Sequence, residues 1–365
     1  MRRRVLVIGA VWALLHVYMG ARLLAHAGVG AGWLALAWGT LLLLALAPFG
    51  AFFALRAEES RLGTALQWAG FTALGLSSIL LVLVVAADVL RVRAWGVEPQ
   101  AVSLGILAGA VALTAAGAWG ARRPRVVRVA VPIAGLPEDL DGFRIVQISD
   151  LHVGPTIGRR FVRAVVDTAN GLDADVLAFT GDVADGMVPA LRDDVAPLAD
   201  LRARYGKFYV IGNHEYYWDA TGWLGELERL GFSVLRNGHQ VLRRGSAKLL
   251  LAGVNDRGSD PVAALAGAPE SDVKVLLAHQ PTRAFAARAA GFDLQLSGHT
   301  HGGQYFPFSL LVRLFQPFVS GLHRLEEMWL YVSRGTGYWG PPLRLGAPSE
   351  ITLIELRAAL QPAAR

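Results

Sequence analysis

Five short polar segments of this 365-residue sequence carry side chains that could bind metal ions or transfer protons. They read "SDLHVG", "TGDVAD", "GNHEYY", "AHQP" and "SGHTHGG". Their candidate residues are two aspartates, one asparagine and five histidines: Asp150, Asp182, Asn213, His152, His214, His279, His299 and His301. Oxygen and imidazole donors suit Mn, Fe or Zn. Thiolate ligands are excluded because the sequence has no cysteine.

Each segment by itself has an ordinary structural explanation. An aspartate at a strand end often stabilises a turn, and a single histidine is commonly a hydrogen-bonded residue of the fold. The joint occurrence favours metal binding, and it supplies more ligands than one ion needs. The set predicts two ions about 3.5 to 4 Å apart that share one carboxylate, an arrangement suited to in-line attack on phosphorus.

Glycines surround the two histidines of the last segment. Glycine adopts backbone conformations that other residues avoid, so the loop can bend tightly. The spacing of two is expected to aim His299 and His301 at the same metal. For Asp150 and His152 the same spacing predicts side chains on one side of an extended backbone, because alternate residues of a strand share a face.

The polar segments follow or end runs of β-branched and apolar residues that predict buried strands. The expected strands read "FRIVQIS", "DVLAFTG", "KFYVIG", "KLLLAGV", "VKVLLAH", "WLYVS" and "EITLIEL". Amphipathic stretches near residues 159–170, 188–203, 219–230 and 281–290 predict helices between them. The pattern predicts an α/β domain whose candidate residues lie in loops past the strand ends, where such folds commonly carry function.

The first third of the chain has a different character. Four stretches reach the length of about 20 apolar residues that a bilayer span needs: 5–25, 31–55, 65–87 and 101–121. The last three contain no charged residue. Fully apolar helices also occur in the cores of large soluble proteins, but four in succession with short Arg-bearing loops favour a transmembrane anchor. We expect this anchor over residues 1–125 and the α/β domain over 126–365.

Charge is distributed unevenly along the chain. Residues 1–130 carry 12 Arg and 4 acidic residues, a balance of +8, and the whole chain has +6, so the remainder has −2. A nucleic-acid partner is therefore not expected. Short cytoplasmic loops are enriched in Arg and Lys. With the N-terminus inside, nine arginines lie on the inner side and three outside: Arg2, Arg3, Arg4, Arg56, Arg61, Arg122, Arg123, Arg125 and Arg128 against Arg22, Arg91 and Arg93. This count predicts a multi-pass protein of the inner (cytoplasmic) membrane whose α/β domain faces the cytoplasm.

The motif series resembles that of the calcineurin-like metallophosphoesterases. Its elements are Asp150-x-His152, Gly181-Asp182, Gly212-Asn213-His214-Glu215, His279 and Gly298-His299-x-His301. The resemblance implies a four-layer α/β/β/α sandwich with two mixed sheets and a dinuclear site at the strand ends. It implies that one ion is held by Asp150, His152 and His301, and the other by Asn213, His279 and His299. Asp182 would bridge the ions, and His214 would contact phosphate and protonate the leaving group.

The segments "HGGQ" and "SRGTGYWGPPLRLGAPSEITLIEL" resemble a bacterial membrane-anchored branch of this family, which includes UDP-2,3-diacylglucosamine hydrolases. The resemblance implies a metal-dependent phosphodiesterase or pyrophosphatase. We expect a lipid-linked substrate, such as a UDP-diacylglucosamine or a phospholipid, because a membrane tether concentrates a lipid near the site. Arg159, Arg160 and Arg334 could bind its phosphate, and solvated surface arginine is the alternative explanation for each.

Two other functions stay open on the sequence alone. The first is a metal-binding scaffold without turnover, and the complete set of candidate ligands argues against it. The second is a regulatory domain on a membrane receptor or transporter. Transport pathways are marked by ionisable residues inside the spans, and here the spans contain only His16 and, near an end, Arg22.

An apolar segment follows the last polar motif. Its residues Leu310, Leu311, Leu314, Phe315, Phe318 and Val319 recur at helical spacing and predict a short helix with a broad apolar face. This face either packs on the core of the domain or lies at the mouth of the site and dips into the inner leaflet.

Overall fold

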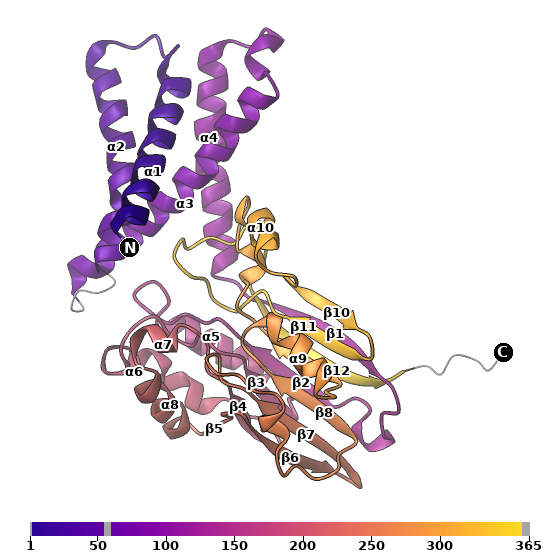
Figure 1. Ribbon diagram of the computed structural model, residues 1–365. Coiled ribbons are helices and arrows are strands. Elements are labelled where there is room, and N and C mark those ends of the chain that lie inside the picture. The colour runs from indigo at the N-terminus through magenta and orange to yellow at the C-terminus, as the bar shows by residue number, and fades with distance from the viewer. Residues whose placement is uncertain (1, 55–59, 360–365) are drawn as a thin grey trace, which may run out of the picture. The chain divides into compact units, whose positions relative to one another are not determined.

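The computed structural model describes residues 2–54 and 60–359 (Figure 1). Its backbone contacts divide the chain into two compact units. The helical unit comprises Met1–Trp119 and Gly340–Leu345, and the α/β unit comprises Gly120–Trp339 and Gly346–Arg365. The division therefore falls a few residues before the expected boundary at 125, and the short return of the chain to the helical unit was not expected. Arg56, one of the arginines counted for orientation, lies outside the described residues.

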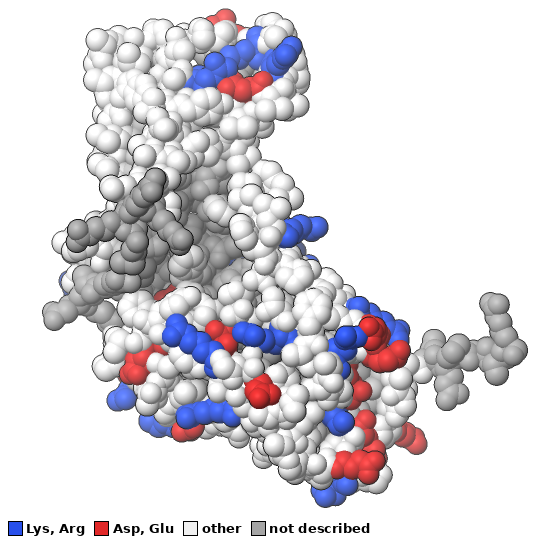
Figure 2. Space-filling view, viewed as in Figure 1, with Lys and Arg blue, Asp and Glu red and all other residues white. Residues whose placement is uncertain are grey.

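Four long helices form the helical unit: α1 (Arg2–Leu24), α2 (Ala31–Ala54), α3 (Arg61–Val89) and α4 (Pro99–Ala121). All four are long and apolar enough to cross a membrane. Figure 2 shows little charge on the visible surface of this unit away from one end. Small residues bring α2 and α3 together, since a Cβ on Gly70 would lie 2.3 Å from the carbonyl oxygen of Ala47. His16 is buried and forms hydrogen bonds with the Trp12 carbonyl and the Ser77 hydroxyl. These contacts give it a structural role within the helical unit.

The segment Gly340–Leu345 packs on glycines of α3 and α4 within the helical unit. A Cβ on Gly75 would lie 2.3 Å from Cδ1 of Leu343, and one on Gly117 would lie 3.3 Å from its Cδ2. The backbone N–H of Arg344 donates to the Gly117 carbonyl. Leu343 therefore occupies a space that exists because two helical positions lack side chains.

Two six-stranded sheets form the centre of the α/β unit. In spatial order, the first contains β1 (Arg125–Ile133), β12 (Glu350–Ala358), β2 (Arg144–Ile148), β3 (Val176–Phe179), β4 (Lys207–Tyr209) and β5 (Phe232–Val234). The second contains β10 (Gly321–Leu325), β11 (Met328–Val332), β9 (Leu294–Ser297), β8 (Val273–Leu277), β7 (Ala247–Gly253) and β6 (Gly238–Arg244). Both sheets mix parallel and antiparallel pairs.

Helices cover the outer face of each sheet, so the unit has four layers (Figure 1). The helices α5 (Arg159–Asn170), α6 (Val188–Val195) and α8 (Ala220–Arg229) pack on the first sheet, and α9 (Ala284–Ala289) packs on the second. Strand β3 is apolar on both faces, as a covered parallel strand requires. Its Val176 and Ala178 face the second sheet, while Leu177 and Phe179 face the helices. The predicted four-layer fold with two mixed sheets is confirmed.

Candidate metal centre

The polar segments lie at the carboxyl ends of strands from both sheets. Three follow the parallel neighbours β2, β3 and β4, and two follow the parallel neighbours β8 and β9. The sheets approach each other at this end, where the backbone N–H of His299 donates to the Asp150 carboxylate at 2.9 Å. A second link joins the Thr336 N–H to the Ser149 carbonyl at 2.7 Å. The fold thus brings together side chains that are up to 151 positions apart in the sequence.

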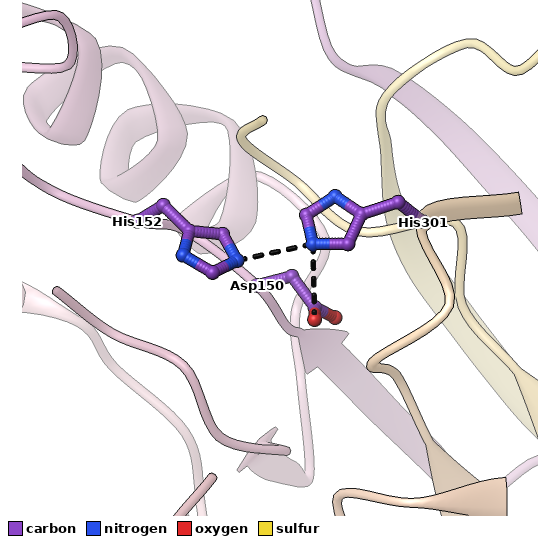
Figure 3. Close-up of side chains that lie close together, drawn as sticks. All are labelled: Asp150, His152 and His301. Carbon is purple, nitrogen blue, oxygen red and sulfur yellow. Dashed lines mark hydrogen bonds and ion pairs between the residues drawn. The ribbon is translucent and has the colours of Figure 1, made fainter. Parts of the chain in front are cut away.

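One group consists of Asp150, His152 and His301, which offer ligand atoms within 4.8 Å of one another. Figure 3 shows the three side chains pointing toward a common point. Nε2 of His301 lies 3.0 Å from Nε2 of His152 and 3.5 Å from Oδ1 of Asp150. All three residues come from loops that follow β2 and β9.

A second group consists of Asp182, His279 and His299, again within 4.8 Å. Nε2 of His279 lies 3.1 Å from Asp182 Oδ2, 3.0 Å from Asn213 Oδ1 and 3.2 Å from His299 Nδ1. The other ring nitrogen of His279, Nδ1, lies 2.8 Å from the Thr180 carbonyl. Because a carbonyl only accepts, this contact places a proton on Nδ1, so Nε2 is the nitrogen that would bind a metal ion.

Asp182 lies between the two groups. Its Oδ2 is 3.1 Å from Nε2 of His279 in the second group and 3.8 Å from Nε2 of His152 in the first. Burial opposes the charged form of this carboxyl, but the surrounding histidines hold its pKa well below the usual range. Asp182 is therefore an ionised, buried carboxylate with one oxygen near both groups.

A third group joins His152 and His214 through Asp185. One carboxylate oxygen of Asp185 lies 2.5 Å from Nδ1 of His214, and the other lies 3.2 Å from Nδ1 of His152. Burial by itself would lower the pKa of His214, but the hydrogen-bonded Asp185 carboxylate raises it to about 9. The sequence reasoning missed Asp185, although the quoted segment "TGDVAD" contains it as the last residue.

Glu215 connects two of the site loops. It belongs to the motif Gly212-Asn213-His214-Glu215, but the sequence analysis assigned it no function. The carboxylate accepts the backbone N–H groups of Asp182, Val183 and Gly212 at 3.2, 2.7 and 2.8 Å. The side chain is fully buried, and burial raises the pKa of this carboxyl. Glu215 thus fixes the Asp182 loop against the Asn213 loop.

Unusual backbone conformations concentrate at the predicted ligands. Among the described non-glycine residues, ten have positive φ, and five of these are predicted ligands: Asp150, His152, Asp182, His299 and His301. Positive φ is uncommon for residues with a side chain and clusters at functional sites. The backbone around Asp150 and His152 is therefore not the extended one that their spacing suggested. For the same reason His299 and His301 do not share one group, and each belongs to a different one.

Two glycines are required here by space and not by φ. A Cβ on Gly298 would lie 1.9 Å from the Ser149 hydroxyl and 2.2 Å from Oδ2 of Asp150. A Cβ on Gly212 would lie 2.1 Å from Oδ1 of Asp182. Side chains at these positions would displace carboxylates that belong to the site.

The residues fit divalent metal ions. Imidazole nitrogens lie 3.0 to 3.5 Å from each other and from carboxylate oxygens, with His152 and His279 buried and His299 and His301 partly exposed. Buried lone pairs that converge in this way are costly unless a cation or proton satisfies them. Nitrogen and oxygen donors in small groups are typical of Mn, Fe or Zn sites.

The three arginines considered for phosphate binding lie in different settings. Arg159 and Arg160 are exposed at the start of α5, and Nη1 of Arg159 donates to the Asp193 carbonyl. Arg334 lies beside the His301 loop, since a Cβ on Gly302 would lie 3.1 Å from its Cγ. Its Nη1 donates to the buried Glu350 carboxylate at 2.8 Å. Of the three, Arg334 is the one in contact range of the metal loop.

Comparison with known proteins agrees with this site. The family described as calcineurin-like phosphoesterase matches residues 143–303. The "Transmembrane protein with metallophosphoesterase domain" of Danio rerio is 41% identical over 256 residues, which cover 66% of this chain and 59% of that protein. The metallophosphoesterase YkuE of Bacillus subtilis is 32% identical over 271 residues, covering 68% of this chain and 92% of that protein. The chain belongs to the calcineurin-like metallophosphoesterases.

A third relative, the metallophosphoesterase Cj0846 of Campylobacter jejuni, is 39% identical over 245 residues, which cover 65% of this chain and 64% of that protein. The chain thus matches less than two thirds of the length of this relative and of the Danio protein. One chain therefore combines a calcineurin-like phosphoesterase domain with four helices that are long and apolar enough to cross a membrane.

Proposed function

We propose that this protein holds two divalent metal ions and hydrolyses a phosphodiester or pyrophosphate bond of a lipid-linked substrate, such as a UDP-diacylglucosamine or a phospholipid. The position of Asp182 carries the proposal for two ions. Its Oδ2 is close to His152 of one ligand group and to His279 of the other. A single carboxylate near both groups is what a dinuclear site needs.

Each ion has its own protein ligands in this proposal. Asp150, His152 and His301 hold the first, and Asn213, His279 and His299 hold the second, with Asp182 shared. Bound Mn, Fe or Zn would supply Lewis acidity and a water nucleophile at neutral pH. The Thr180 carbonyl lies against Nδ1 of His279 and the Asp185 carboxylate lies against Nδ1 of His152, so Nε2 of each ring would face its ion.

His214 acts as the general acid. Its Nδ1 is held by Asp185, and its Nε2 lies 3.9 Å from Asp182 Oδ2, so Nε2 faces the site. With a pKa raised to about 9, the ring is protonated at neutral pH. It can therefore give the Nε2 proton to the departing alkoxide oxygen and be reprotonated afterwards.

The membrane setting supports a lipid-linked substrate. Helix α4 ends at Ala121 and strand β1 begins at Arg125, so very little chain separates the last apolar helix from the catalytic sheet. A tether of this kind raises the effective concentration of a membrane-bound substrate and gives a soluble nucleotide no such advantage. The excess of Arg on one side of the spans supports a cytoplasmic site.

A hydrolysis panel on the purified full-length protein tests the function. The substrates are bis-p-nitrophenyl phosphate, p-nitrophenyl phosphate, UDP-diacylglucosamine and a glycerophospholipid, each with added Mn²⁺ and after chelation. We expect turnover of the diester and of one lipid substrate, loss after chelation and recovery with Mn²⁺. Full activity in chelator contradicts the metal requirement, and turnover of water-soluble esters alone contradicts the lipid-linked substrate. No turnover of any ester, with metal bound, favours the scaffold function.

A further inference from the structure

An exposed apolar surface lies just after the metal loop. It is formed by α10 (Phe308–Leu311), η7 (Val312–Leu314) and their neighbours. We call it the α10 surface, and its side chains are Phe306, Phe308, Leu310, Leu311, Leu314 and Phe315. Leu314 is 74% exposed and Phe315 is 80% exposed. Large apolar side chains gathered in this way mark interaction sites on proteins.

The core does not cover this surface, contrary to one of the two sequence-based alternatives. Only Phe318, at the end of the segment, packs on the core of the second sheet. Its ring lies 5.6 Å from that of Phe285 and 5.3 Å from that of His323. The expected continuous face is therefore divided, with Leu310 to Phe315 outward and Phe318 inward.

The α10 surface is firmly attached to the metal loop. A Cβ on Gly303 would lie 2.3 Å from Cα of Ser309, so the start of α10 packs directly on the loop that carries His301. At the other end of the segment, the Thr300 hydroxyl donates to the Val319 carbonyl at 2.5 Å. Whatever holds the α10 surface therefore also positions the metal loop.

Backbone pairing links this segment to the start of β1. Tyr305 forms a β-bridge with Gly346, and three residues later the Ser349 carbonyl accepts the N–H of Arg125 at 2.9 Å. Three extended residues span about 10 Å. Arg125 in turn follows the last residue of α4, Ala121, by four positions. The α10 segment is thus held near the point where the chain leaves its last apolar helix.

The α10 segment and two segments near it along the backbone contain basic residues but no acidic ones. The sequence has no Asp or Glu in residues 299–325, 334–349 or 119–137. The basic residues in these three segments are Arg122, Arg123, Arg125, Arg128, Arg313, Arg324, Arg334 and Arg344. Figure 2 shows an uncharged protrusion at the place of α10 in Figure 1, with basic side chains beside it. Arg334 and Arg324 are ion-paired with Glu350 and Glu327, and Arg344 is buried, whereas Arg313 is exposed within η7 itself. An apolar surface that carries an exposed arginine complements an anionic phospholipid leaflet.

We propose that the α10 surface inserts into the anionic leaflet on its own side of the membrane and holds the metal loop at the depth of the lipid headgroups. Leu310, Leu311, Leu314 and Phe315 enter the boundary between headgroups and acyl chains, and Arg313 contacts lipid phosphates. This inference rests on the membrane association of the proposed function and adds the surface that presents lipid phosphoesters to the site.

A single introduced cysteine tests the insertion, because the chain has no other. Full-length Phe315→Cys protein is labelled with an environment-sensitive fluorophore and reconstituted in vesicles of phosphatidylcholine with phosphatidylglycerol. Val262→Cys is the matched control, since Val262 is also apolar and 69% exposed. Leu314→Cys is a second reporter in case Phe315→Cys folds poorly.

We expect lipid-attached quenchers to reduce the emission at 315 or 314 at least about twofold more than at 262. The difference should shrink in vesicles of phosphatidylcholine alone, because Arg313 then loses its anionic partner. Equal, weak quenching at 314, 315 and 262 overturns the inference. Shielding of position 315 from water without lipid quenching points to contact with a second protein copy and overturns it too.

The labelling result does not depend on catalysis. A protein that binds metal but hydrolyses nothing still shows the quenching if the surface inserts, so the inference survives a failure of the proposed activity. Hydrolysis of lipid substrates without quenching removes the inference and leaves the proposed function intact.

Discussion

The Asp185 carboxylate lies 2.5 Å from Nδ1 of His214 and 3.2 Å from Nδ1 of His152. One carboxylate therefore forms a hydrogen bond with the predicted general acid and lies close to a predicted metal ligand. Because each contact uses Nδ1, the Nε2 atoms of both rings are directed toward Asp182, at 3.8 and 3.9 Å. The nitrogen of a histidine that contacts a carboxylate determines which nitrogen is left to bind a metal or transfer a proton. We therefore expect His152 to bind metal and His214 to transfer a proton.

His214→Ala should lower the rate of hydrolysis by about 10² or more with poor leaving groups, because the general acid is lost. The loss should shrink for p-nitrophenolate, which departs without protonation. Metal content should stay close to that of the unchanged protein. The measurements are kcat for an alkyl and a p-nitrophenyl diester, with metal per chain from elemental analysis.

Asp185→Asn serves as the companion variant. It keeps the shape of the side chain but removes the charge that holds His214 protonated. Its hydrolysis rate should therefore fall more for poor leaving groups than for p-nitrophenolate, as in His214→Ala. If His214→Ala protein instead loses its metals, His214 is a ligand and the role assigned to it is wrong.

Asp182→Asn should damage the site more than any other conservative change of a ligand. Among the described carboxylates, Asp182 is the one with an oxygen within 4 Å of an imidazole nitrogen in each ligand group, so its loss should weaken the binding of both ions. Metal per chain and hydrolysis rate are compared with those of Asp150→Asn and of the exposed control Asp167→Asn. Unchanged metal content and full activity in Asp182→Asn protein would sink the dinuclear assignment.

Gly298→Ala tests the close approach of the two sheets. Its Cβ would overlap the Ser149 hydroxyl and the Asp150 carboxylate, so we expect loss of bound metal and destabilisation on the order of 1 to 3 kcal/mol. Gly225→Ala is the control, because a Cβ there meets nothing within 4 Å and alanine favours the helix by up to about 1 kcal/mol. Thermal unfolding in detergent and metal analysis report the two effects. A metal-replete, fully stable Gly298→Ala protein contradicts the geometry.

The main features of the site follow from short-range patterns. Apolar runs such as "DVLAFTG" are long enough to identify central strands, and a polar segment directly after each run places its side chains at a sheet edge. The four long apolar helices follow in the same way from length and composition alone. These features depend on residues that are neighbours in sequence.

Other features depend on tertiary contacts that local patterns do not encode. Strands β1, β5, β6, β9 and β10 were not predicted. Of these, β5 is short and β6 is largely polar, and pairing with β4 and β7 stabilises them. The role of Asp185 appears only when the loop after β3 meets His214 and His152. Likewise, the positive φ of His299 and His301 separates two imidazoles that strand-like alternation would place together.

The orientation of the protein remains a prediction of the arginine count, nine on one side against three on the other. A phosphatase reporter fused after Arg365 should be inactive in cells, because such reporters need export, and a fluorescent reporter at the same position should be bright. Fusions in the loop near residue 27 should give the opposite result. An active phosphatase at the C-terminal fusion would place the catalytic unit outside.

Replacing Leu314 and Phe315 by serine should separate lipid turnover from turnover of soluble esters. Both side chains are largely exposed, so their loss should leave the fold and the metal site unchanged, whereas the α10 surface loses its insertion into lipid. We expect KM for a lipid substrate in vesicles to rise about tenfold, while bis-p-nitrophenyl phosphate is hydrolysed at the original rate. Val262→Ser, at another exposed apolar position, should change neither. Phe318→Ser should impair both substrates alike, because Phe318 packs on the core. An equal loss on both substrates in the Leu314→Ser, Phe315→Ser protein would mean that these side chains support the fold and do not contact lipid.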